Sequence, residues 1–120
     1  MTEKLGWILR SLDKHLARDV EAIDVRGVSA ITDCFVFATG GSTTQVKALS
    51  DYVEKELSEH GVMPQRVEGY HNNARWILMD YGDVILHIFL QEARDFYDLE
   101  RLWQDGTAVN IADFMETEEI

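Results

Sequence analysis

The spacing of hydrophobic and polar residues along the first third of the chain predicts one helix followed by two strands. Residues 3–17 carry large aliphatic side chains at helical spacing, so we expect an amphipathic helix whose buried stripe is Leu5, Ile8, Leu9, Leu12 and Leu16. Residues 20–25 alternate apolar and acidic side chains, which predicts a strand that ends before Gly27. Residues 34–38 (CFVFA) are continuously apolar, which is typical of a strand buried on both faces.

A clear helix start follows this second strand. Thr39-Gly40-Gly41 ends the strand, and Ser42 with Gln45 three residues later forms a capping-box pattern. We therefore expect a helix over residues 43–60 that stops at Gly61 and buries Val46, Leu49, Val53 and Leu57. A short third strand is expected over residues 65–68, after Pro64.

Residues 75–90 contain two apolar runs that flank Tyr81-Gly82, a spacing that predicts a β-hairpin with a two-residue turn. This turn would pair Asp80 with Asp83, Leu78 with Ile85 and Trp76 with His87. Because side chains alternate across a strand, one face of the hairpin is wholly apolar, with Ile77, Met79, Val84, Leu86, Ile88 and Leu90. The other face carries Trp76, Leu78, Asp80, Asp83, Ile85, His87 and Phe89.

The pattern ends with a shorter amphipathic helix over residues 95–103 and an acidic segment beyond it. Residues 113–120 include four acids and are expected to fray. One strand–helix crossover combined with one hairpin favours an α/β fold, a mixed sheet with helices packed on it. We predict one domain over residues 1–105 and an acidic C-terminal tail over residues 106–120.

Composition narrows the function classes. The 120 residues include 11 Lys and Arg against 22 Asp and Glu, a net charge of −11 that argues against direct binding to nucleic acid or to an anionic membrane. The charge favours a basic partner or simply solubility. Cys34 is the single cysteine and is expected to be a packed, inert thiol. No signal peptide or membrane-spanning run is evident, so we expect a cytoplasmic location.

Candidate chemistry in the sequence is sparse. Gly40-Gly41-Ser42 at a strand–helix junction could hold a phosphate, although helix capping explains the same residues and the lysine of a P-loop is missing. A divergent nucleotidyltransferase or nucleotide-binding protein is therefore the alternative hypothesis. The four histidines are scattered and do not predict a metal site. We expect no cofactor, no metal and no catalytic residues.

The mixed face of the hairpin is the stronger candidate site. An apolar patch with Trp76, Leu78 and Phe89, rimmed by acids, is typical of a protein-docking surface. Two other interpretations stay open at this point. A helix could cover the patch as part of the core, or a second copy of the chain could pack on it to form a homodimer.

Four segments of the chain carry a specific resemblance to a known family. They are DVRGVSAITDCFVFATGGSTTQVKAL, VEGY, WILMDYGDVILHIF and ARDFYDLERLW, in that order. Together they cover about residues 5–103, and this pattern closely resembles the ribosomal silencing factor family, also called the Iojap family.

The resemblance implies a non-enzymatic translational repressor with a fold similar to nucleotidyltransferases. Members bind a protein of the large ribosomal subunit, universal large-subunit protein fourteen, and block joining of the subunits when nutrients are scarce, as in stationary phase. Carried over by motif, the implied partner-binding residues are Trp76, Leu78, Asp80, Tyr81, His87, Phe89, Arg94, Tyr97 and Asp98.

Overall fold

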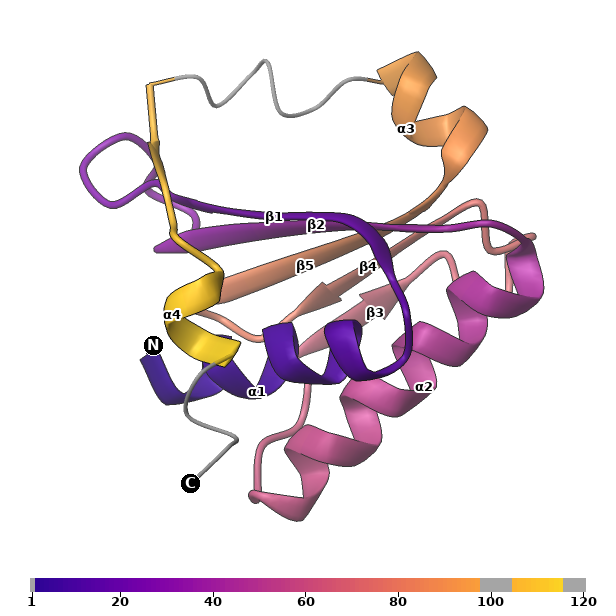
Figure 1. Ribbon diagram of the computed structural model, residues 1–120, viewed down its shortest axis with the longest axis horizontal. Helices are drawn as coiled ribbons and strands as arrows, with labels where there is room; N and C mark the ends of the chain where they lie inside the picture. The colour runs from indigo at the N-terminus through magenta and orange to yellow at the C-terminus, as the bar shows by residue number, and fades with distance from the viewer. Residues whose placement is uncertain (1, 98–104, 116–120) are drawn as a thin grey trace.

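A six-stranded mixed β-sheet forms the centre of the molecule (Figure 1). The structure is a computed structural model that describes residues 2–97 and 105–115. The strands lie in the order β3-β4-β5-β2-β1-β6, with β2 and β5 parallel and every other neighbouring pair antiparallel. Their bounds are β1 Arg18–Asp24, β2 Cys34–Gly40, β3 Arg66–Glu68, β4 Trp76–Asp80, β5 Val84–Leu90 and β6 Thr107–Ala108. The predicted α/β domain with a mixed sheet is confirmed.

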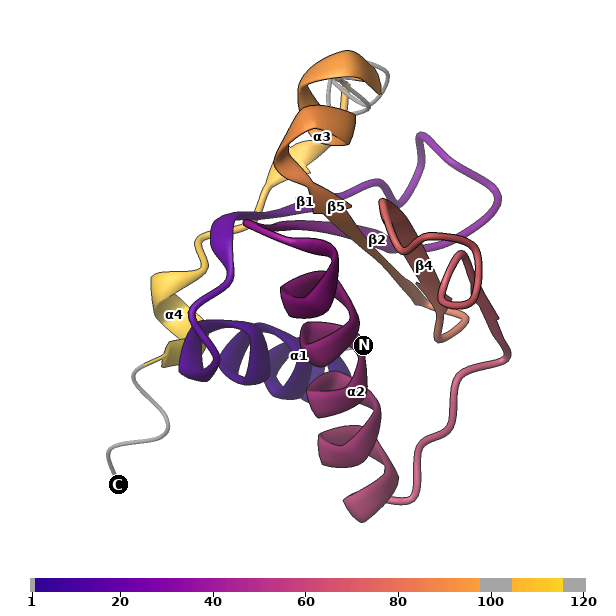
Figure 2. The same cartoon turned by 90° about the vertical axis from the view of Figure 1, so that its right-hand side faces the viewer.

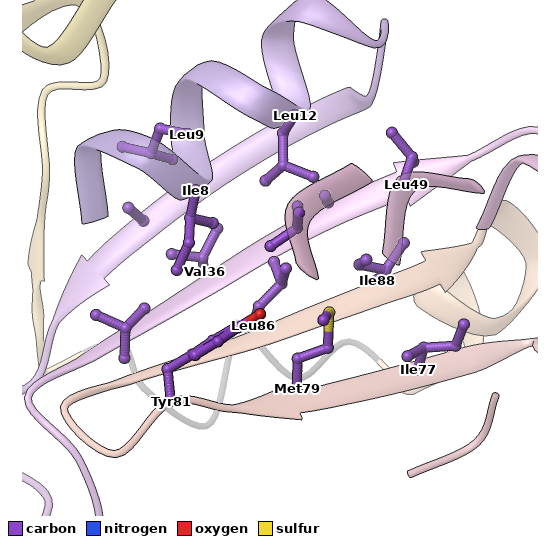
Figure 3. Close-up of a cluster of buried hydrophobic side chains, with 14 of the residues drawn as sticks. Ile8, Leu9, Leu12, Val36, Leu49, Ile77, Met79, Tyr81, Leu86 and Ile88 are labelled. Atoms are coloured by element: carbon purple, nitrogen blue, oxygen red, sulfur yellow. The ribbon is translucent and has the colours of Figure 1, made fainter. Parts of the chain in front are cut away.

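Two helices, α1 (Thr2–Lys14) and α2 (Thr43–Glu59), pack against one face of the sheet, and the short helix α3 (Gln91–Tyr97) lies on the opposite side (Figure 2). The predicted stripes of α1 and α2 are buried against this sheet face, except for Leu16. Figure 3 shows Leu86, Met79 and Ile77 of the hairpin among them. We call the sheet side chains on this side the aliphatic face: Val36, Ile77, Met79, Val84, Leu86 and Ile88.

The start of α2 has the predicted cap. The backbone N–H of Gln45 donates to the Ser42 hydroxyl at 3.1 Å, and the N–H of Gly41 donates to Oε1 of Gln45 at 2.7 Å. These side chains satisfy amides that the first helical turn leaves without intrahelical partners. The Gly-Gly-Ser junction is therefore explained by helix capping.

The hairpin has the predicted strands but a different register. Trp76 pairs with Phe89, Leu78 with His87 and Asp80 with Ile85, so the predicted pairs are wrong by two residues. Gly82 and Asp83 form the turn, closed by a hydrogen bond from the Tyr81 N–H to the Val84 carbonyl. The reason is backbone geometry: Gly82 has φ +87°, which the first loop position of a primed turn requires and which Tyr81 would adopt only with strain.

A shift of two residues keeps every strand residue on its predicted face, because side chains alternate with a period of two. The two turn-proximal residues are placed differently. Asp83 lies in the turn, where Lys4 Nζ is 2.8 Å from its carboxylate, and does not rim the mixed face. Tyr81 packs with the aliphatic face (Figure 3).

Several predicted boundaries were wrong. Helix α1 ends at Lys14, and Leu16 has φ +66° and is 77% exposed, so it does not extend the buried stripe. Strand β1 begins at Arg18, two residues before the predicted start. The last amphipathic helix begins at Gln91, directly after β5, and not at Asp95. The predicted part of that helix beyond residue 97 lies outside the described residues up to 104.

The described part of the predicted acidic tail is packed on the domain. Strand β6 pairs with β1 through Ala108 with Ile23 and Thr107 with Asp24. A short helix, α4 (Ala112–Met115), follows, and Arg10 Nη1 donates to the Phe114 carbonyl at 3.0 Å. The prediction that the chain frays from residue 113 was therefore wrong for residues 113–115, and residues 116–120 lie outside the described part.

Candidate docking face

The mixed face of the hairpin joins side chains of β2 to form a layer of aromatic rings. We call this the aromatic face, and it consists of Phe35, Phe37, Trp76, Leu78, Ile85, His87 and Phe89. The ring centroids of Phe37 lie 5.3 Å from His87 and 6.4 Å from Phe89, with interplanar angles of 14° and 21°. Such stacking fixes neighbouring rings more firmly than area burial alone.

Phe35 and Phe37 are the residues of this face that the hairpin pattern did not reveal. Their i, i+2 spacing within CFVFA places them on one side of a strand. The parallel pairing of β2 with β5 then sets Phe35 beside Ile85 and Phe37 beside His87. The sequence of the hairpin alone does not predict this pairing, because β2 lies far from β5 along the chain.

Exposure varies across the aromatic face. Phe37 and Phe89 are fully buried, and Phe35, Ile85 and His87 are also buried. Trp76 and Leu78, both from β4, are half-buried and contribute the accessible part of the apolar surface. Asp80 continues this row at the turn end, where it is half-buried and its Oδ1 accepts a hydrogen bond from the Gly82 N–H at 2.8 Å. The face therefore combines a rigid aromatic base with an accessible β4 edge.

His87 is the ionisable group inside this layer. Its Nδ1 lies 3.0 Å from the indole Nε1 of Trp76, which donates the hydrogen bond. Burial lowers the pKa of His87 to about 4, so the imidazole is neutral at physiological pH. The apolar surroundings and the hydrogen bond thus act together to keep this side chain uncharged.

Two further residues implied by the resemblance, Tyr81 and Arg94, are not part of the aromatic face. Tyr81 is buried on the opposite side of the sheet. Arg94 of α3 is buried and donates to the Asp19 carbonyl, to the Thr39 hydroxyl at 2.8 Å and to the Glu21 carboxylate at 2.7 Å. Tyr97 is the last residue of α3, and Asp98 lies outside the described residues.

The hydrogen bonds of Arg94 give this residue a structural role, which is to attach α3 to the sheet. Its guanidinium connects α3 to β1 and β2 through three different acceptors, which suits the rigid fork of donors that arginine carries. Ala93 beside it packs into the aromatic cluster. Arg94 and Ala93 therefore fix α3 against the same side of the sheet that carries the aromatic face.

Two other kinds of site are relevant among the described residues, a reactive cysteine and a metal centre. Cys34 is buried in β2, and burial with a contribution from Asp24 raises the pKa of its thiol to about 12, as expected for an inert packed cysteine. Across residues 2–97 and 105–115, no group of three or more His, Cys, Asp or Glu side chains could hold a metal ion. Within the same ranges, no helix has the length and apolarity needed to cross a membrane.

The fold and this face define a small acidic α/β domain that packs α1 and α2 on one face of its sheet and gathers aromatic rings on the other. The family model described as "Ribosomal silencing factor during starvation" matches residues 1–120. The chain belongs to this ribosomal silencing factor family, as the sequence motifs had indicated.

Similar bacterial proteins carry the name of this family. The chain is 38% identical over 109 residues to the ribosomal silencing factor RsfS of Halalkalibacterium halodurans, covering 91% of this chain and 92% of that protein. It is 35% identical to the RsfS of Bacillus subtilis, over 82% and 83% of the two chains. A mouse relative, named mitochondrial assembly of ribosomal large subunit protein 1, is 33% identical over 82% of this chain and 44% of its own length.

Solved structures share the fold. A crystal structure of a protein from Bacillus halodurans superposes with a TM-score of 0.81 at 35% identity, covering 92% of this chain and 99% of the other. A crystal structure from Chromobacterium violaceum gives a TM-score of 0.82 at 35% identity, covering 86% and 85% of the two chains.

Proposed function

We propose that this protein represses translation by binding the large ribosomal subunit and obstructing its association with the small subunit, as its family resemblance implies. The partner is a basic protein of that subunit, universal large-subunit protein fourteen, and the repression operates in nutrient limitation. The protein acts without catalysis, because occupancy of the subunit surface is sufficient for steric blocking. The observation that carries this proposal is the aromatic face with its accessible edge at Trp76 and Leu78.

The physical support lies in how this face is built. A rigid apolar base loses little conformational freedom on binding, and tryptophan is one of the side chains enriched among the residues that anchor interfaces. Asp80 stands at the end of the same row and can meet a basic group on the partner. Trp76, Leu78 and Asp80 are therefore proposed as contacts, and His87 and Phe89 as the base that supports them.

Net charge supports the choice of partner. A charge of −11 repels the protein from ribosomal RNA and attracts it to basic proteins of the same particle. Electrostatic attraction of this kind raises the association rate and orients the encounter. Tyr97 and Asp98 remain proposed contacts from the resemblance, while Tyr81 and Arg94 are buried and are proposed to act through the packing they maintain.

Substitution of the anchor tests the proposal. Trp76→Ala is expected to weaken binding to purified large subunits by about 30-fold, which corresponds to an anchor contribution of ~2 kcal/mol. Binding is measured by co-sedimentation with large subunits, and the consequence by the yield of joined ribosomes when small subunits are added. The mutant should also lose the ability to prevent joining.

A matched control keeps the test specific. Tyr52 of α2 is an exposed aromatic residue on the helix-covered side of the sheet, and Tyr52→Ala should leave binding unchanged. Circular dichroism establishes that both variants are folded. If folded Trp76→Ala binds large subunits as tightly as the unmodified protein does, the proposed docking face is wrong.

A further inference from the structure

The hydrogen bond between Trp76 and His87 links two strands of the aromatic face diagonally. In the β4–β5 ladder, Trp76 pairs with Phe89 and His87 pairs with Leu78. The indole of Trp76 therefore reaches past its direct partner to the neighbouring pair, where its Nε1 lies 3.0 Å from Nδ1 of His87. Diagonal contacts of this kind are within reach of aromatic side chains on one face of an antiparallel pair.

The chemistry of the two rings fixes the position of each proton. An indole N–H can only donate, so Nδ1 of His87 must accept with its lone pair. A neutral imidazole carries one proton, which then resides on Nε2. In the described ranges, Nε2 of His87 makes no hydrogen bond to another protein atom. One tautomer of His87 is therefore selected by Trp76.

The imidazole cannot easily turn away from this geometry. Its ring centroid lies 5.3 Å from that of Phe37 and 5.9 Å from that of Phe89, both at an interplanar angle of 14°. A third ring, Phe35, lies 5.7 Å away. His87 is 6% exposed. The acceptor atom is thus held in place by packing, and it is presented to the one half-buried ring of the layer.

Trp76 is held from two sides. Its indole lies 5.2 Å from the Phe89 ring at 30°, and its N–H is bound by His87. A large side chain whose orientation is already fixed loses less rotamer freedom when a partner binds. Its only polar atom is also satisfied internally, so a partner meets an apolar ring that needs no hydrogen-bond acceptor.

We propose that His87 is a positioning residue of the docking face, which fixes the Trp76 indole through a hydrogen bond at Nδ1 and so preorganises the anchor for its protein partner. The consequence for binding rests on the proposed function. The positioning itself is a property of the free protein and can be tested without any ribosomal component.

The first experiment follows the Trp76 indole N–H by NMR in the free protein, with its resonance assigned by its loss in Trp76→Phe. His87→Phe keeps an aromatic ring and removes the acceptor, so the resonance should shift and its proton should exchange with solvent at least several-fold faster. His87→Asn carries an amide oxygen on the same Cγ that bears Nδ1, and it should restore much of the slow exchange. If the indole proton exchanges at the same rate in the unmodified protein, His87→Phe and His87→Asn, the proposal is overturned.

A second measurement on the unmodified protein avoids reliance on any variant that fails to fold. The ¹⁵N shifts of His87 at neutral pH should show Nδ1 without a proton and Nε2 with one. A proton on Nδ1 contradicts the hydrogen bond and overturns the proposal.

Binding then connects the positioning to function. His87→Phe should weaken binding to large subunits by about fivefold, and His87→Asn by less. In a Trp76→Phe background, which has no indole N–H, the same His87→Phe change should have little further effect. A full additional loss in that background would mean that His87 acts independently of Trp76. If Trp76→Ala leaves binding unchanged while the NMR results hold, the proposed function fails at this face and the positioning role of His87 stands.

Discussion

The two faces of the central sheet use the same three strands for different purposes. On the aliphatic face, β2, β4 and β5 place Val36, Met79, Leu86 and Ile88 beneath α1 and α2, where each is fully buried. On the aromatic face, most of the alternate residues of the same strands are stacked rings, and Trp76 and Leu78 remain half-buried. One face is therefore fully buried, and the other combines packing with an accessible surface.

The largest difference in the free energy of unfolding is expected between substitutions of two leucines in the same hairpin. Leu86→Ala, on the aliphatic face, should lower the free energy of unfolding by about 3 kcal/mol, because a fully buried leucine leaves a cavity. Leu78→Ala, on the aromatic face, should lower it by only about 1 kcal/mol because Leu78 is half-buried. Urea unfolding of both variants measures the difference. Equal losses would show that the two faces contribute alike to stability.

Protonation of His87, which is buried in the aromatic face, should make the free energy of unfolding depend on pH. Its pKa is about 4 in the folded protein against 6.5 for an unperturbed histidine, so the unfolded chain binds the proton first as pH falls. The stabilising contribution is fully present above about pH 6.5 and is lost progressively down to about pH 4, a change of roughly 3 kcal/mol.

Urea unfolding at a series of pH values tests this prediction. His87→Phe is the control, because it leaves in place the carboxylates that titrate in an overlapping pH range. The variant should lack the part of the pH dependence that falls between 6.5 and 4. Superimposable pH profiles for the two proteins would contradict a buried, neutral His87.

Loss of the contacts that attach α3 beside the aromatic face should lower the free energy of unfolding by a smaller amount. Arg94→Met keeps much of the aliphatic stem and removes the bonds to Asp19 and Thr39, and it should lower the free energy of unfolding by about 2 kcal/mol. Glu21→Gln should change it by less than about 0.5 kcal/mol, because the Glu21 side chain is 55% exposed. Thermal unfolding compares the two. A larger loss for Glu21→Gln would mean that the ion pair, and not the acceptors of Asp19 and Thr39, holds α3.

The smallest effect is expected at Tyr81 and has the opposite sign. Within the described residues, its buried hydroxyl has no hydrogen-bond partner, so Tyr81→Phe removes an unsatisfied polar atom from the aliphatic side. The free energy of unfolding should rise by up to about 1 kcal/mol, and binding to large subunits should not change. Chemical denaturation and co-sedimentation are the measurements. A clear loss of binding in Tyr81→Phe would show that this hydroxyl reaches the partner.

Local sequence features predicted the elements well where one strong signal acted alone. The capping residues Ser42 and Gln45 located the start of α2, and the continuous apolar run located β2. The turn was misplaced because Tyr81-Gly82 and Gly82-Asp83 are equally short loops, and only the second puts glycine at the first loop position, where a primed turn needs a positive φ. Fraying was wrongly predicted for residues 113–115 because the prediction considered the acids there and not Phe114 and Met115, which pack against the core.

The candidate site could be predicted only in part. Trp76, Leu78, His87 and Phe89 share a face because side chains alternate along a strand, whatever the exact register. Motif resemblance also included Tyr81 and Arg94, but it could not show that one lies across the sheet and that the other is bound to Asp19, Thr39 and Glu21.

The sequence by itself determined the fold class, the two faces of the hairpin, the acidic charge and the family, because each depends on spacing and composition along the chain. Only the tertiary structure decided that β2 lies parallel to β5, that Phe37 stacks on His87, and that the imidazole accepts the Trp76 proton. These contacts join residues far apart in sequence or on neighbouring strands. They form because burial of the whole sheet fixes strand order and register together, which no local pattern specifies.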